Sequence, residues 1–410
     1  MEHTGDNMNR VRRNNRSAVL RLLHEHQNLS RKRLAEQTLL TPAAITKITG
    51  ELIAEGLVHT GDALSTGRAG RREIGLSPNP RSRCALGLLL NRGQAVLSAA
   101  WLDGSVIFTE SCPLPVPAPA EETLARLCAR LNALCREHAL SPDAILGVGV
   151  AVRGVPAEDG RRVRNSFGAL EGRDLPLCAL VESLTGLPAI LENNVRALLA
   201  AQLFLSAGEQ KRSQFFLRCE YGIGGALAVN GQVWSGASRQ CSEIGHIPVV
   251  REGGKRCVCG RCGCLETLAS PAALREDAAA LLSPEATPLL WRLHAAHPES
   301  PLSLEEIFDA AEGGDAPIAA LADRAAAALA DALKAVLCTI NPEDIVLYGS
   351  LFDHPWFLRR LKEQMARGEE EGRLVFPVLS PYNHRLEQVA APLLMVEDFL
   401  ASGGFARALG

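Results

Sequence analysis

The sequence predicts an α/β protein in which a small N-terminal winged helix-turn-helix domain, residues 1–80, precedes a two-lobed α/β body, residues 81–410. Three observations support this prediction. Three helical segments, with a tight turn before the third, precede Gly56. Strand pairs followed by helices occur twice in the remainder of the chain. The length of 410 residues also exceeds what one domain needs, since single cores stop growing at roughly 250–300 residues.

The composition indicates a soluble folded protein, with 47% hydrophobic and 22% charged residues. We expect a cytoplasmic protein without a membrane span, because no run of about 18 apolar residues occurs and residues 1–6 lack the apolar segment of a secretory signal. Residues 1–80 contain twelve Lys and Arg against eight Asp and Glu, although the whole chain carries a net charge of −3. The basic N-terminal part is therefore expected to meet a polyanion such as DNA.

The third helical segment has the features of a DNA-recognition helix. Thr41 and Pro42 predict its start, because a capping hydroxyl followed by proline at the first helical position is a strong helix signal. Apolar residues recur at helical spacing from Ile45 to Ile53, so one face is buried, and the small side chains of the opposite face allow close approach to the major groove. The residues predicted to contact DNA from this helix are Thr41, Ala43, Ala44, Thr46 and Lys47.

A Gly- and Arg-rich segment, residues 65–72, lies between two short strand-like pieces and predicts the wing. Arg68, Arg71 and Arg72 are expected to contact phosphate or the minor groove. The alternative is a three-helix interaction module with a solvated basic loop. Residues 77–80 are interpreted as a linker to the body.

Alternating strand-like and helical runs in the body predict two α/β lobes with a cleft between them. The strand-like runs are 85–90, 95–102, 144–152, 215–219, 226–229 and 345–348, and the main helical runs are 121–137, 197–206 and 318–337. Two apolar helical regions, 316–337 and 387–400, are candidates for a subunit interface, although burial in the core explains their pattern equally well.

Cysteines are concentrated in one short segment of the body. Of the twelve cysteines, Cys257, Cys259, Cys262 and Cys264 lie within eight residues, and His246 precedes them. A disulfide scaffold is unusual in a chain of this kind, so the cluster predicts a metal site. Thiolates with one imidazole are common zinc ligands. Two ligand sets remain open, His246 with Cys257, Cys259 and Cys264, or all four cysteines, and in either case the zinc is expected to be structural.

Two motifs of the body resemble the signatures of the ROK family (repressor, open reading frame, kinase). The first is Glu243-Ile244-Gly245-His246, and the second is Cys257-Val258-Cys259-Gly260-Arg261-Cys262-Gly263-Cys264-Leu265-Glu266. The N-terminal domain resembles the DNA-binding part of the transcriptional branch of this family. The resemblance implies a sugar-kinase/actin-like fold and one structural zinc ion in the loop 243–266, on His246, Cys257, Cys259 and Cys264, with Cys262 as a spare. The residues that it implies for a sugar or sugar-phosphate effector are Asn193, Asn194, Glu243, His246 and Glu266.

The sequence departs from the kinases of this family at two places. Asn194 stands where they carry the aspartate that acts as general base, and an amide cannot accept a proton from a sugar hydroxyl. Residues 89–93, Leu-Leu-Asn-Arg-Gly, replace the Asp-x-Gly-Gly-Thr of their first phosphate loop. We therefore expect a protein that is not an enzyme but a sugar-responsive repressor, bound to a double-stranded DNA operator as a homodimer or tetramer. The alternatives are a sugar kinase with an appended DNA-binding domain and a regulator controlled by a protein partner.

Overall fold

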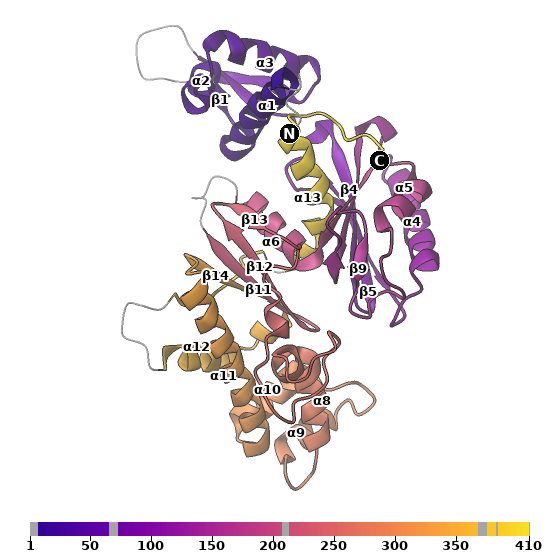
Figure 1. Cartoon of the computed structure of the whole chain (residues 1–410), viewed down its shortest axis with the longest axis vertical. Helices are drawn as coiled ribbons and strands as arrows, with labels where there is room; N and C mark the ends of the chain where they lie inside the picture. Colours follow the sequence, from indigo (N-terminus) through magenta and orange to yellow (C-terminus); the bar gives the residue numbers. More distant parts are fainter. Residues whose placement is uncertain (1–6, 65–72, 207–212, 368–374, 383, 410) are drawn as a thin grey trace. The chain divides into compact units, whose positions relative to one another are not determined.

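The computed structural model describes residues 7–64, 73–206, 213–367, 375–382 and 384–409. The chain divides into two compact units (Figure 1). Unit 1 comprises residues 1–210 and 384–410, and unit 2 comprises residues 211–383. The chain thus leaves unit 1, forms unit 2, and returns to unit 1 through its last helix.

The N-terminal part of unit 1 is a winged helix-turn-helix. Its elements are α1 (Asn7–His26), β1 (Leu29–Ser30), α2 (Arg31–Thr38), α3 (Pro42–Ala54), β2 (Val58–Leu64) and β3 (Glu73–Pro78). The three strands form a sheet in the order β1-β3-β2. Leu39 adopts a left-handed conformation in the turn between α2 and α3, with φ 58°. Leu23, Leu34, Ile45, Leu52 and Leu76 have no exposed surface, so one small core holds the helices against the sheet.

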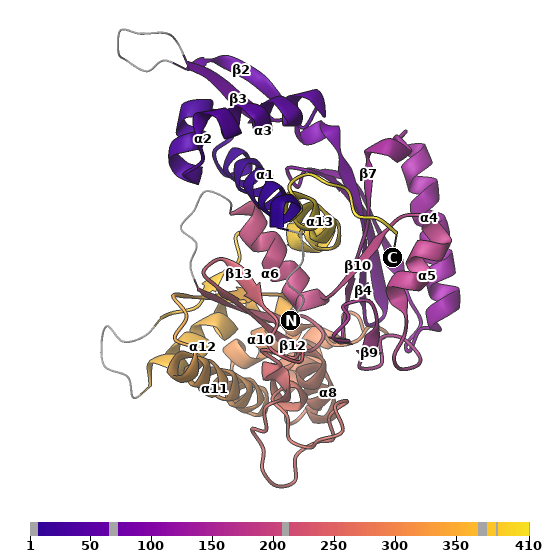
Figure 2. The same ribbon diagram turned by 45° about the horizontal axis from the view of Figure 1, so that its top comes forward.

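A mixed five-stranded sheet forms the centre of the rest of unit 1. The strand order is β10-β7-β4-β5-β6, with β4 (Cys84–Asn91), β5 (Gln94–Trp101), β6 (Val106–Pro113), β7 (Ile145–Val152) and β10 (Ala189–Asn193). β4, β5 and β6 are antiparallel neighbours, whereas β7 is parallel to β4 and to β10. Helices α4 (Ala120–Glu137) and α5 (Leu177–Thr185) cover one face, and α6 (Asn194–Leu205) and α13 (Arg385–Ala401) lie on the other (Figure 2).

Helix α13 packs unusually closely on this sheet. A Cβ atom at Gly87 of β4 would overlap Pro392, and one at Gly149 of β7 would overlap the carbonyl group of Ala391. The two glycines therefore let the helix backbone approach the strands directly. Because these two positions lack side chains, they determine where α13 crosses the sheet.

Unit 2 contains the second five-stranded sheet, in the order β13-β12-β11-β14-β15. The strands are β11 (Gln214–Cys219), β12 (Ile223–Val229), β13 (Gln232–Trp234), β14 (Asp344–Tyr348) and β15 (Val378–Leu379). The helices are α7 (Glu266–Ala269), α8 (Pro271–Leu281), α9 (Pro288–His294), α10 (Leu304–Gly313), α11 (Ala316–Thr339) and α12 (Pro355–Ala366). A core of buried Leu, Ile, Phe and Ala side chains joins the helices to the sheet.

The predicted α/β fold class is confirmed, and the two predicted strand pairs are β4–β5 and β11–β12. The sequence did not predict β6, because apolar and polar residues alternate only weakly along it. Its side chains are accordingly buried in an irregular pattern. The apolar surface of α13 is largely explained by burial: ten of its side chains, from Leu386 to Leu400, are buried within the chain. Within the described ranges, every helix is too short or too polar to cross a membrane.

Candidate functional site

The candidate metal ligands lie in one small cluster in unit 2. His246 ends a short 3-10 turn, residues 244–246, and Cys257, Cys259 and Cys264 come from the loop that precedes α7. The ligand atoms of these four residues all lie within 4.8 Å of one another. Cys257 Sγ is 3.4 Å from His246 Nδ1, and Cys259 Sγ is 3.7 Å from Cys264 Sγ. Three thiols and one imidazole are a donor set that suits tetrahedral zinc, so the cluster could bind a metal ion.

The backbone holds the cysteine loop in place independently of any metal. The amides of Val249 and Val250 both donate to the carbonyl oxygen of Gly263, and the amide of Leu265 donates to that of Ile247. Cys257 and Cys264 are buried, whereas Cys262 is exposed and is not a member of the cluster. Burial raises the pKa of the Cys264 thiol to about 12. A bound cation would oppose that effect, because it stabilises the thiolate.

Glu266, which follows the cysteine loop, connects it to the central sheet of unit 2. This residue begins α7, and its Oε2 accepts a hydrogen bond of 3.0 Å from the amide of Ile223. Ile223 is the first residue of β12, directly after the tight turn from β11. Glu243 precedes the 3-10 turn, and its carbonyl oxygen accepts from the amide of His246. The structure thus places three of the predicted effector residues next to the cysteine loop. Glu243 and His246 lie before it, and Glu266 follows it.

The other two predicted effector residues, Asn193 and Asn194, belong to unit 1, at the junction of β10 and α6. Asn193 caps α6, because its Oδ1 accepts from the amides of Val195 and Arg196 at 2.9 and 3.2 Å. Its Nδ2 donates to the carbonyl oxygen of Gly154 at 2.8 Å. The buried Asn193 side chain therefore fixes the start of α6 and ties it to Gly154.

Asn194 contacts a residue that the sequence did not single out as a partner. Its Nδ2 donates to Asn91 Oδ1 at 2.8 Å. Asn91 is the last residue of β4 and lies in the segment 89–93, which the sequence identified only as an altered phosphate loop. Buried Arg196 and half-buried Glu192, on either side of Asn194 in the sequence, form an ion pair with 2.7 Å between Oε1 and Nη2. The polarity of Asn91 was visible in the sequence, but its pairing with Asn194 was not.

The predicted DNA-contacting residues of α3 lie on its outer face. Thr41, Ala43, Thr46 and Lys47 are exposed and Ala44 is half-buried, whereas Ile45, Ile48 and Leu52 are buried. Thr41 Oγ1 accepts from the amide of Ala44 at 3.2 Å, which is the predicted helix cap. On the inner side, Arg31 Nε donates to Thr49 Oγ1 and so joins α2 to α3. Arg68, Arg71 and Arg72 lie outside the described residues.

Comparisons with known proteins agree with this geometry. The model of the ROK family matches residues 97–385. The N-acetylglucosamine repressor of Escherichia coli O157:H7 is 28% identical over 349 residues, which cover 84% of this chain and 82% of that protein. A crystal structure described as a ROK family transcriptional regulator, homologous to the Mlc protein of E. coli, superposes with a TM-score of 0.77 at 25% identity. It covers 96% of this chain and 98% of its own.

The fold is also that of a sugar kinase. A ROK family glucokinase from Streptomyces griseus, in complex with glucose and AMPPNP, superposes with a TM-score of 0.64 at 22% identity, over 76% of this chain and 98% of its own. At this identity the likeness concerns the fold alone.

Proposed function

Because this chain belongs to the ROK family, whose model matches residues 97–385, we propose that it is a DNA-binding transcriptional regulator that represses genes of sugar uptake and catabolism. A sugar or sugar phosphate bound in the ROK domain would control its affinity for the operator. The proposed domains are residues 1–80 for DNA binding and residues 81–410 for the effector. The chain is homologous to sugar-responsive ROK repressors over more than four fifths of its length.

The observation that carries this proposal is the outer face of α3. A helix that follows a tight turn, begins at a threonine cap and exposes Ala43, Thr46 and Lys47 is built to enter a major groove. Exposed Lys47 supplies positive charge, and the small neighbours allow the backbone to approach the base edges. Nothing in such a face serves phosphoryl transfer, so a DNA-reading role explains the N-terminal part better than catalysis does.

We propose Asn193, Asn194, Glu243, His246 and Glu266 as the effector-binding residues. Amides and carboxylates suit this role because they form hydrogen bonds with pairs of sugar hydroxyls. A ligand that lacks one of these hydroxyls would leave buried polar groups of the site unpaired. The relative whose name includes N-acetylglucosamine supports a sugar as the class of effector. Asn194 donates to Asn91 and offers no general base, which supports binding without phosphorylation.

We propose that His246, Cys257, Cys259 and Cys264 hold one structural zinc ion per chain. When bound, the ion would cross-link the 3-10 turn to the cysteine loop. His246 would present a ligand from one end of this loop, and Glu266 would stay fixed at the other through its bond to Ile223. The metal would thereby set the positions of the acidic residues that we assign to the effector.

A binding experiment tests the function directly. Selection from a random duplex library with the full chain is expected to yield a preferred operator, and fluorescence anisotropy then measures its affinity with a panel of sugars and sugar phosphates. At least one compound is expected to shift operator affinity by about 5–150-fold, the usual range of allosteric coupling. Failure to select any duplex would contradict DNA binding. A selected operator whose affinity ignores the whole panel would contradict the sugar effector and favour a protein effector.

A further inference from the structure

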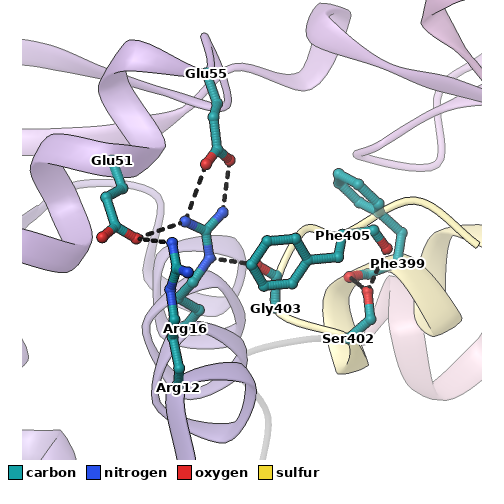
Figure 3. Close-up of polar contacts among 8 residues, drawn as sticks. All are labelled: Arg12, Arg16, Glu51, Glu55, Phe399, Ser402, Gly403 and Phe405. Atoms are coloured by element: carbon teal, nitrogen blue, oxygen red, sulfur yellow. Dashed lines mark hydrogen bonds and ion pairs between the residues drawn. The ribbon is translucent and has the colours of Figure 1, made fainter. Parts of the chain in front are cut away.

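One fully buried charge lies where the DNA-binding helices meet the end of the chain. The guanidinium group of Arg16, on α1, has no exposed surface. Its Nη1 donates to Glu51 on α3 and to Glu55, the C-cap residue of α3, each at 3.0 Å, and its Nη2 pairs with the second oxygen of Glu55. Its Nε donates to the carbonyl oxygen of Gly403 at 2.8 Å (Figure 3). Three separate segments, α1, α3 and the residues after α13, thus converge on one guanidinium group.

The residues that follow α13 have a conformation that allows the contact with Arg16. We call residues 402–405 the C-terminal latch. Ser402 Oγ lies 2.8 Å from the carbonyl oxygen of Phe399 in α13 and 2.6 Å from that of Phe405, and its one O–H donates between these two acceptors, which ties the latch to the helix end. Gly403 adopts φ 79°, and a Cβ atom there would meet the backbone of Arg13 and the side chain of Arg16. Only glycine allows the latch to turn and to lie this close to α1.

Phe405 covers the same charge with its ring. The centroid of the Phe405 ring lies 4.6 Å from Cζ of Arg16 and 5.6 Å from Cζ of Arg12 (Figure 3). Both distances are within the range of a cation–π interaction, which is stronger when the cation is removed from water. Arg12 also donates to Glu51 at 3.0 Å, so the ring lies near both arginines that bind Glu51.

A buried guanidinium group is stable only while its hydrogen-bonding groups and ion pairs are complete. The latch supplies the acceptor for Arg16 Nε and the aromatic cover, and α3 with its C-cap residue supplies both carboxylates. The position of the last turn of α3 is therefore energetically coupled to the position of the latch. Because α13 packs on β4, β7 and α6, and Asn193 caps α6, the latch is the end of a packed series of elements within unit 1.

We propose that the C-terminal latch, through Arg16, positions the recognition helix α3 for DNA binding. Arg16 and Phe405 are positioning residues in this proposal, since neither lies on the outer face of α3. The part that concerns DNA rests on the proposed function, whereas the coupling of α3 to the latch does not.

The test uses Phe405→Leu in the full chain, because leucine keeps an apolar side chain but removes the ring. Phe405→Tyr restores a ring and is the conservative variant. Arg21→Ala is the matched control: Arg21 also joins α1 to α13, through an ion pair of 2.8 Å with Glu397, but this ion pair does not involve α3. Amide hydrogen exchange is measured without DNA or effector, with β7 as the internal reference for global stability.

In Phe405→Leu, exchange in the last turn of α3 is expected to accelerate at least about fivefold while β7 keeps its rate. Affinity for a duplex selected by the unaltered chain is expected to fall about tenfold, and Phe405→Tyr is expected to restore both values. Arg21→Ala is expected to change neither by more than about twofold. Unchanged exchange in α3, unchanged affinity, or an equal effect of Arg21→Ala would overturn the proposal. If the unaltered chain selects no duplex, the proposed function fails, and the exchange measurement alone decides the coupling.

Discussion

Cys262 separates the two ligand sets that the sequence left open. It is exposed and lies apart from the cluster formed by His246, Cys257, Cys259 and Cys264. Cys257→Ser is therefore expected to lose about one zinc ion per chain and to lower the unfolding temperature, because a metal that binds only the folded loop contributes to folding free energy. Cys262→Ser is expected to change neither quantity. Metal analysis of the purified variants and thermal unfolding are the measurements.

A further variant, His246→Ala, shows whether this assignment is wrong. Full zinc retention in His246→Ala together with loss in Cys262→Ser would establish the four-cysteine set instead.

Sequence reasoning succeeded where the signal is local. The Thr41-Pro42 helix start was predicted from adjacent residues, and the cysteine cluster was found from its spacing, although the spacing left two ligand sets open. It failed where the partner is distant. Asn194 contacts Asn91, 103 positions away, and Arg16 contacts Gly403, 387 positions away. Periodicity and local motifs contain no information on such pairs, because only the tertiary fold brings them together.

At the level of elements, the packing of α1 against α3 depends on ionised glutamates. Glu51 accepts hydrogen bonds from Arg12 and Arg16. The hydrogen bond from Arg12 is the main reason why the pKa of Glu51 is lowered from its ordinary value. A carboxyl group whose pKa is lower in the folded state stabilises the fold above its unfolded pKa, and this contribution is lost as the pH falls through the folded pKa.

The N-terminal helices are therefore expected to loosen in acid, as the pH falls below about 4.3, the ordinary pKa of a glutamate. Glu51→Gln is expected to lower stability near pH 7 and to reduce this pH dependence, since the amide has no proton to gain. Urea unfolding at several pH values between about 3 and 7 measures both effects. Glu36→Gln, on the exposed surface of α2, is a suitable control because the side chains that lower the pKa of Glu51 are Arg12 and Arg16. An identical pH dependence in the unaltered chain and in Glu51→Gln would contradict this expectation.

The elements themselves were easier to predict than their arrangement. The strand pairs β4–β5 and β11–β12 follow from short turns, so the sequence identified them and the two α/β sheets that they begin. The role of α13 did not follow, because an apolar helix near the end of a chain packs equally well on its own sheet or on a second subunit. Gly87 and Gly149 allow α13 to pack on the sheet of its own chain. This role can be recognised only in the structure, where α13 lies directly on them.

At the scale of the whole molecule, one winged helix is too small to specify an operator by itself. A recognition helix contacts only a few base pairs, and symmetric dimers overcome this limit by reading two half-sites about 10 base pairs apart. We expect the purified chain to be at least a dimer, with twofold symmetry, and the selected operator to be an inverted repeat. Light scattering gives the mass in solution, and the selected sequences show the repeat.

The spacing of the half-sites provides the sharper test. Insertion of about 5 base pairs between the half-sites turns one of them to the opposite side of the duplex, whereas insertion of about 10 returns it to the same side. A rigid dimer is expected to lose most of its affinity with the first insertion and to recover part of it with the second. Equal affinity for all three duplexes and for a single half-site, from a chain that remains monomeric, would show that each winged helix reads DNA independently.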